Sequence, residues 1–214
     1  MSKLPTSASV ATPVEGAKLS APSALRNLPV ILELMQSHAP AQGRALEIAS
    51  GTGQHITALA KTFPNIDWFP TEISSERIAS IDAYAIEASL PNLQPAQMLD
   101  AAQAGWAAQN SPFDLVYLGN LLHLIPLGAA QTILTETAQA LAPSGTAIFY
   151  GPFMRCGVLT SEGDARFDAQ LREADPDIGY KDDQWVNDVL TECGLSVTVE
   201  AMPANNIAFI ARRD

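Results

Sequence analysis

The sequence predicts an α/β fold with a seven-stranded, mostly parallel sheet, an antiparallel final strand and helices on both faces. Three observations predict it. Short apolar runs alternate with segments of helical periodicity, a glycine turn joins the first such pair, and two strand-like runs close the chain around a turn. Ligands bind such sheets beyond the carboxyl ends of the strands, so the candidate site residues are sought at that edge.

Composition limits the possible classes of protein. The chain has 214 residues, 47% of them apolar, which is enough for one sizeable core and a single domain. Its net charge of −11 argues against nucleic acid and anionic membranes as partners. Two cysteines without metal-type spacing and three histidines predict a reducing, cytoplasmic setting and no metal site. A possible homodimer is left open.

The expected elements alternate along the chain. Residues 1–20 lack periodicity and predict a flexible tail, or a segment that orders over a site; one domain spans 21–214. Ser23 is the expected N-cap of the first helix. Pro95 makes the third strand doubtful, and 151–180, helical in part around 164–173, is too long for a connector and predicts a lid insertion over a substrate site. The expected strands are 44–49, 66–72, 93–99, 113–118, 146–150, 195–201 and 207–212, and the other helices are 53–63, 75–89, 127–142 and 183–193.

The glycine turn Ser50-Gly51-Thr52-Gly53 is the first candidate site. It lies between a strand and a helix, so it exposes unpaired backbone N–H groups at the helix N-terminus to a polar or anionic ligand. Glu47 ends the buried strand before it. A carboxylate there must be paired, which predicts a cationic ligand group or the N–H groups of the loop as its partner.

Three polar residues follow the next strands at the same edge. Glu72 lies one strand–helix–strand unit after the glycines, where an acidic residue grips ribose hydroxyls in nucleotide folds; the alternative is a solvated carboxylate. Asp100 is predicted either to accept a hydrogen bond from an adenine amino group or to cap a helix. Asn120 is predicted to hold an ammonium or carboxylate of a ligand.

The ends of the fourth and fifth predicted strands supply candidate residues for the reaction site. His123 follows the fourth strand and is predicted to be a general base, although the leucines around it favour a packed imidazole equally. Tyr150 and Phe153 lie at the end of the fifth strand and are predicted to form a wall of a substrate pocket, the alternative being a tyrosine ring in the core. Tyr150 is also predicted to border the site of methyl transfer together with His123.

Two further segments are substrate-site candidates. Arg26 and Asn27 lie on the first helix, and Arg26 is predicted to anchor a substrate or lid, or to form an ordinary surface pair. Asn205 and Asn206 lie in the closing turn, where they either face the substrate or supply a left-handed backbone, and Asn205 is the predicted substrate contact.

The pattern as a whole resembles class I S-adenosylmethionine-dependent methyltransferases, which have a Rossmann-like sheet. Residues 47–53 match their first motif, with Ala49 at the position of the first glycine. The chain is most similar to the DUF938 methyltransferase-like family, through the segments 26–27, 46–55, 150–153 and 202–206. The resemblance implies that Gly51 and Gly53 lie against the methionine part of the cofactor, that Glu72 binds its ribose and Asp100 its adenine.

The expected function is therefore methyl transfer from S-adenosylmethionine to a small molecule through an O, N or S atom. A nicotinamide-dependent dehydrogenase is less favoured, because Ile56 stands where its fingerprint needs a small residue. A non-catalytic binding or partner subunit with the same fold is the other alternative.

Overall fold

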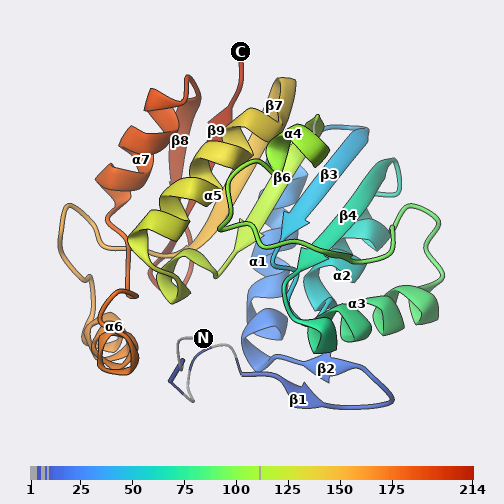
Figure 1. Cartoon of the computed structure of the whole chain (residues 1–214), viewed down its shortest axis with the longest axis horizontal. Helices are drawn as coiled ribbons and strands as arrows, with labels where there is room; N and C mark the ends of the chain where they lie inside the picture. Colours follow the sequence, from blue (N-terminus) through green and yellow to red (C-terminus); the bar gives the residue numbers. More distant parts are fainter. Residues whose placement is uncertain (1–3, 6–7, 9, 111) are drawn as a thin grey trace.

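A computed structural model describes residues 4–5, 8, 10–110 and 112–214. In this part of the chain, one seven-stranded sheet has the order β5-β4-β3-β6-β7-β9-β8 (Figure 1). Its strands are β3 Gly43–Ile48, β4 Ile66–Glu72, β5 Gln97–Met98, β6 Phe113–Gly119, β7 Leu141–Pro152, β8 Ser196–Ala201 and β9 Asn206–Arg212.

The strand order reverses at β3, which pairs in parallel with β4 on one side and with β6 on the other. Connections leave β3 and β6 in opposite directions there, which opens a crevice at their carboxyl ends. Only β9 runs against the rest, pairing antiparallel with both β7 and β8. The predicted sheet, including its antiparallel final strand, is confirmed.

Helices cover both faces because side chains alternate along each strand. Ala45 of β3 faces a cluster under α1, α2 and α3, whereas Leu46 faces a cluster under α4, α5 and α7 (Figure 1). The helices of the first layer are α1 Pro22–His38, α2 Gln54–Thr62 and α3 Ser75–Ala88; those of the second are α4 Ala107–Asn110, α5 Leu127–Ala140 and α7 Asp183–Glu192.

Three local predictions change. The helix α1 begins at Pro22 with Ala21 as its N-cap, not Ser23, because proline fits the first helical position and the amide of Ala21 donates to Gln54 Oε1 (2.7 Å). The doubtful third strand shrinks to Gln97–Met98. The strand β7 starts earlier than predicted and passes through Ser144 at φ +62°.

Part of the predicted tail forms a hairpin. Strands β1 Thr12–Pro13 and β2 Leu19–Ser20 pair antiparallel and dock on α3, where the amide of Leu19 donates to Ser80 Oγ (2.8 Å) and the hydroxyl of Tyr84 donates to the carbonyl of Leu19 (3.1 Å). Residues 1–3, 6–7 and 9 of that prediction lie outside the described residues.

The long segment after β7 holds α6, Glu162–Ala174, which matches the predicted helical part. This helix stands away from the sheet, beside the N-terminal segment (Figure 1). A small cluster of Ala8, Leu171, Ile178 and Tyr180 joins the two. Among the described residues, no helix combines the length and apolarity needed to span a membrane.

Candidate functional site

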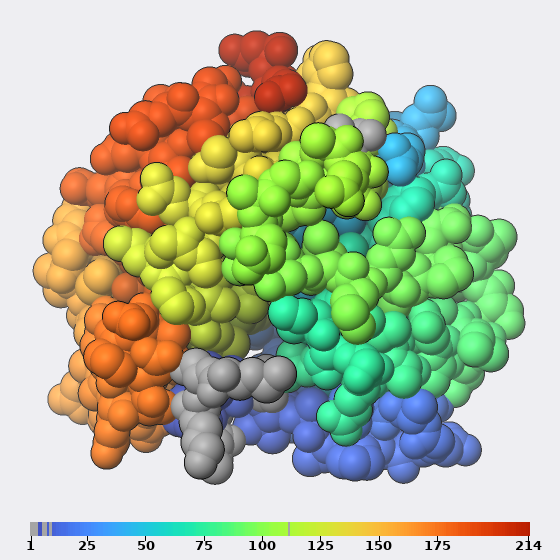
Figure 2. All heavy atoms as spheres, viewed as in Figure 1, coloured from blue at the N-terminus to red at the C-terminus, as the bar shows by residue number. Residues whose placement is uncertain are grey.

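A cavity of about 770 Å³ lies at the carboxyl edge of the sheet, where the strand order reverses. Figure 2 shows a hollow at this edge, between the α3 side in teal and the α5 side in yellow-green. We name two parts of the lining, and residues 11, 21, 23, 24, 26, 27 and 133 line the rest of the cavity. The glycine-loop half comprises residues 47–52, 55, 72–74, 77, 99–102 and 119–121; the ring half comprises residues 123–125, 152, 164, 167, 180, 204 and 206 with the N-terminal residues 4, 8 and 10.

The glycine turn takes the shape that its sequence predicts. Gly53 is the N-cap of α2 at φ +91°, and a Cβ there would lie 2.8 Å from the Cα of Ile81, so the loop and α3 meet too closely for any side chain. Gly51 is also left-handed, at φ +60°. Ala49 adopts φ +55° as well, so the alanine in place of the first glycine carries the strained backbone itself.

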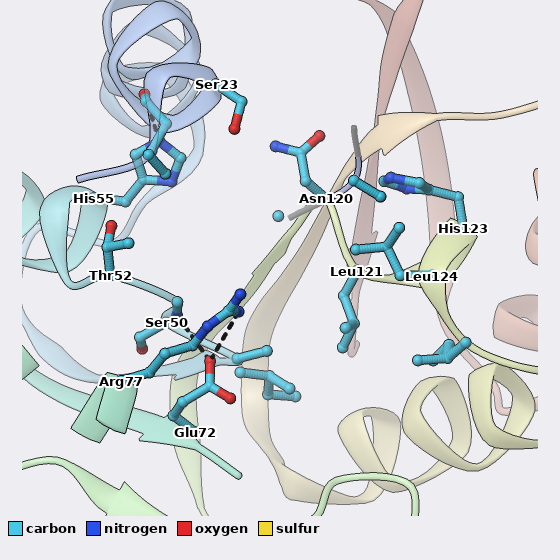
Figure 3. Close-up of a pocket in the computed structure, with 18 of the residues that line it drawn as sticks. Ser23, Ser50, Thr52, His55, Glu72, Arg77, Asn120, Leu121, His123 and Leu124 are labelled. Atoms are coloured by element: carbon cyan, nitrogen blue, oxygen red, sulfur yellow. Dashed lines mark hydrogen bonds and ion pairs between the residues drawn. The ribbon is translucent and has the colours of Figure 1, made fainter. Parts of the chain in front are cut away.

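Glu72 ends β4 with a buried carboxylate on the cavity. Its Oε2 accepts from the amide of Gly51 (3.0 Å), and its Oε1 accepts from the amide of Ile73 (2.8 Å). The guanidinium of Arg77 lies 3.8 Å away (Figure 3). These contacts fix the carboxylate against the glycine loop, 21 residues earlier in the chain.

Glu47 is buried and lines the same half, and its Oε2 has no hydrogen-bond partner in the structure. Burial, with a contribution from the charge of Glu72, raises the pKa of the Glu47 carboxyl to about 7. Beside it in the sheet lies Tyr117, whose hydroxyl is also unpartnered. An unpaired buried carboxylate is costly unless a ligand supplies a cation or a donor.

Asp100 and Asn120 complete this half. Asp100 Oδ1 accepts from the amide of Ala102 (3.1 Å) in a turn, so the carboxylate caps a turn rather than the helix that the sequence allowed. Asn120 has φ +58°, and its backbone N–H donates to the carbonyl of Tyr150 (2.8 Å). The side chain of Asn120 is therefore free of this contact and lies at the cavity (Figure 3).

The ring half takes its name from three aromatic rings of different elements. His123, in the short helix η1 Leu122–Leu124, lies 5.8 Å from the ring of Phe167 on α6 and 6.0 Å from the ring of Tyr180. Phe167 and Tyr180 are 6.2 Å apart. His123 is buried, and burial together with the charge of Lys181 lowers the pKa of its imidazole to about 3. The imidazole is neutral at physiological pH.

Polar groups of the ring half hydrogen-bond one another. The Oδ1 of Asp164 accepts from the hydroxyl of Tyr180 (3.1 Å), and its Oδ2 accepts from Asn205 Nδ2 (3.2 Å). The neighbouring Asn206 lines the cavity and donates its Nδ2 to the hydroxyl of Tyr150 (3.1 Å).

Several predicted residues lie away from the cavity lining. Tyr150 is buried in the core with its hydroxyl on Asn206, and Phe153 packs edge-on against Phe209 with ring centroids 5.0 Å apart. Asn205 holds the left-handed turn at φ +60° and bonds Asp164, while its neighbour Asn206 reaches the cavity. Arg26 and Asn27 do line it, from the first turns of α1.

Three lining residues have no clear sequence signal: Arg77, Phe167 and Tyr180. Phe167 and Tyr180 belong to the region predicted as a lid, but nothing in their spacing marks them. The sequence marks Asn205 and Asn206 as a pair, and of the two Asn205 is the predicted substrate contact. Since side chains alternate along a strand, only the start of β9 at Asn206 decides which of the two turns inward.

Several solved structures with a similar fold are described as methyltransferases. An O-methyltransferase family protein from Burkholderia thailandensis superposes with a TM-score of 0.76 at 15% identity, over 90% of this chain and 57% of that one. A structure of PigF with SAH gives 0.74 at 17% identity, over 89% and 56%. This chain thus spans little more than half the length of either. The fold is the Rossmann-like fold of S-adenosylmethionine-dependent methyltransferases.

The chain belongs to the family described as "Protein of unknown function (DUF938)", whose model matches residues 18–213. A shorter similarity links it to a tRNA (guanine-N(7)-)-methyltransferase of Lactobacillus johnsonii, 35% identical over 74 residues. That match covers 35% of this chain and 34% of the relative. The predicted family and fold are confirmed.

Proposed function

We propose that this protein binds S-adenosylmethionine in the glycine-loop half of the cavity and transfers its methyl group to a small molecule in the ring half. The observation that carries the proposal is the continuity of the two halves. One cavity runs from the glycine turn and the carboxylates at the ends of β3 and β4 to a second compartment under α6. A donor and an acceptor need such a shared space, because their reacting atoms must meet in line.

The residues of the glycine-loop half fit the cofactor. The unpartnered Oε2 of Glu47 offers an acceptor to a cationic group, and S-adenosylmethionine carries an ammonium and a sulfonium. Gly51 lines the cavity and leaves its backbone open to close approach, whereas Gly53 lies outside the lining and shapes the turn against α3. Glu72 and Asp100 supply carboxylate oxygens at the cavity for ribose hydroxyls and an adenine amino group. When bound, the cofactor supplies an activated methyl group on a positively charged sulfur.

The protein's own part is to position the reactants and to exclude water. Asn120 stands where the two halves meet. The rings of the second half give the acceptor an apolar wall. Tyr150 does not line the cavity, but its hydroxyl accepts a hydrogen bond from Asn206 Nδ2 and so orients the Asn206 side chain. The net charge of −11 favours a small acceptor over the nucleic acid that the Lactobacillus relative's name specifies.

Titration calorimetry tests the proposal. S-adenosylmethionine and S-adenosylhomocysteine should each bind at one site, and NAD should not. Glu72→Gln should weaken binding about 10- to 100-fold, because a charge-assisted hydrogen bond to the ligand is lost. Glu76→Gln, which removes an exposed carboxylate from the first turn of α3 outside the cavity lining, is the matched control. Absence of binding to the wild-type protein, or preferential binding of NAD, would overturn the proposal.

A further inference from the structure

The ring half is shaped for a flat, largely apolar molecule. Its three rings come from η1, α6 and the segment before α7, and they contact one another over 5.8–6.2 Å. Leu124 and Ile125 extend this wall, and Leu4, Ala8 and Val10 of the N-terminal segment line the cavity beside it. Aromatic rings pack best against another ring or a planar apolar body. An apolar wall of this kind favours a planar acceptor.

The carboxylate of this half is not available as a base. Asp164 Oδ2 accepts from the hydroxyls of Thr160 (3.0 Å) and Ser161 (2.8 Å) and from Asn205 Nδ2, and its Oδ1 accepts from the hydroxyl of Tyr180. Four hydrogen bonds therefore occupy the two carboxylate oxygens. A proton taken from an acceptor would displace one of them, so Asp164 serves to fix α6 and Tyr180 in place.

The imidazole of His123 is equally unsuited to proton removal. It is buried among rings, and no hydrogen bond to another described residue orients either ring nitrogen. The ammonium of Lys181, held by the carbonyls of Ile125 (2.7 Å) and Gly179 (2.8 Å), is close enough to disfavour a second positive charge. Protonation of His123 therefore costs free energy. Its aromatic face remains as its contribution to the site.

Arg26 brings an exposed positive charge to the cavity lining. Among the described residues that line the cavity, the guanidinium groups are those of Arg26 and Arg77, and Arg77 lies beside Glu72. Arg26 is exposed, and within the described chain no carboxylate lies within ion-pair distance of it. In so acidic a protein, an exposed arginine that lines a cavity and has no ion pair with a described carboxylate attracts an anion.

We infer that the acceptor is a planar, largely apolar molecule whose reacting atom is an anionic oxygen, as in an acidic phenol, an enol or a carboxylic acid, and that Arg26 binds this charge. The inference rests on the function proposed above. The acceptor's oxygen forms a bond to the methyl carbon while the carbon–sulfur bond breaks, and that electron pair stays on sulfur. The negative and positive charges cancel. No proton remains to be removed, which is why the ring half needs no base.

A matched panel of acceptors on one ring system tests this. Naphthoic acid, nitro-substituted naphthols, naphthalenemethanol and naphthylmethylamine differ in the reacting group and share the planar body. With radiolabelled S-adenosylmethionine at neutral pH, the acid and the acidic naphthols should be methylated at least about tenfold faster than the alcohol and the amine, because only they are ionised to an oxygen anion. Faster transfer to the alcohol or the amine would overturn the inference.

Arginine variants test the second part. Arg26→Gln should raise the KM of the acidic acceptors about five- to tenfold and leave the affinity for the cofactor unchanged, because a charge-assisted hydrogen bond to the acceptor is lost. Arg26→Lys should recover part of the effect. Arg166→Gln, an exposed arginine of α6 outside the cavity lining, is the matched control. Weaker cofactor binding with unchanged acceptor KM would assign Arg26 to the cofactor and refute its role here.

The two proposals fail in different ways. If calorimetry detects no S-adenosylmethionine binding, the proposed function fails. If the cofactor binds and none of the anionic acceptors is methylated, the proposed cofactor site stands and the inference about the acceptor fails.

Discussion

The glycine-loop half and the ring half of the cavity are built from the chain in different ways. The glycine-loop half comes mainly from consecutive strand ends, so Glu47, Glu72 and Asp100 follow one another at regular intervals and meet because the strands are parallel. The ring half joins segments that are far apart, from Ala8 to Asn206. Its parts meet only once α6 and the N-terminal segment pack together.

The two halves of the cavity should therefore differ in how well they tolerate amino-acid substitutions. The glycine-loop half depends on backbone conformations that few residues adopt, so single substitutions there should have large effects. The ring half depends on apolar packing, which accepts side chains of similar size and shape. The following experiments run from the largest expected effect to the smallest.

Gly53→Ala should break the glycine-loop half. A Cβ at Gly53 would approach the Cα of Ile81 to 2.8 Å, and φ +91° is strained for alanine, so the turn must move. We expect S-adenosylmethionine affinity to fall about 100-fold or more by calorimetry. Gly128→Ala, in α5 with nothing within 4 Å of the added methyl, is the control. Equal affinities in variants that circular dichroism shows to be folded would refute this account of the turn.

Glu47→Gln should change how the free energy of unfolding depends on pH. Because burial raises the pKa of Glu47 from 4.5 to about 7, its contribution to stability is fully present below pH 4.5 and is lost as the pH rises through 7. Glutamine carries no titratable carboxyl, so the variant does not lose this stability as the pH rises. Its free energy of unfolding should therefore exceed that of the wild-type protein by up to about 3 kcal/mol at pH 8, with a smaller gap at pH 5.

Denaturant titrations at the two pH values measure this gap, with Glu33→Gln on the exposed face of α1 as the control. Cofactor binding should report the same carboxyl. A cationic ligand group favours the ionised form of Glu47, so binding near pH 7 should release a proton, which calorimetry in buffers of different ionisation enthalpy detects. A gap that does not change with pH would contradict the shifted pKa.

His123→Phe should have the smallest effect. If the imidazole acts through its aromatic face, phenylalanine preserves the wall and turnover should stay within about threefold of the wild-type value, whereas His123→Ala opens the ring half and should lower turnover about tenfold. Cofactor affinity should not change in either variant. A general base at His123 predicts instead that both variants lose activity to the same extent, and that result would restore the catalytic role expected from the sequence.

Much of the glycine-loop half could be predicted from the sequence. The strand before Gly51 and the helix after Gly53 have their own periodicities, and the left-handed turn between them follows from residue types that favour it. Glu72 was placed at the same edge by counting one strand–helix–strand unit. Its contact with the amide of Gly51 shows how well this counting works when neighbouring strands are parallel.

The ring half could not be predicted in the same way. His123 was singled out for its titratable group, but the rings of Phe167 and Tyr180, which lie more than 40 residues away, set its environment. Tyr150 was singled out for its position after β7, and the register of β7 against β9 directs its hydroxyl to Asn206. Neither environment has a local signal in the sequence.

The sequence by itself determined the α/β sheet, the antiparallel last strand and the glycine turn, because each rests on periodicity or on the conformational preferences of neighbouring residues. Only the tertiary structure decided which side chains share the cavity. It buried the Oε2 of Glu47 with no hydrogen-bond partner among the described residues, moved Tyr150 and Phe153 into the core and brought Asn206 to the cavity in place of Asn205. The physical reason is that burial and pairing depend on contacts between distant segments, which form only when the sheet and its covering helices have assembled.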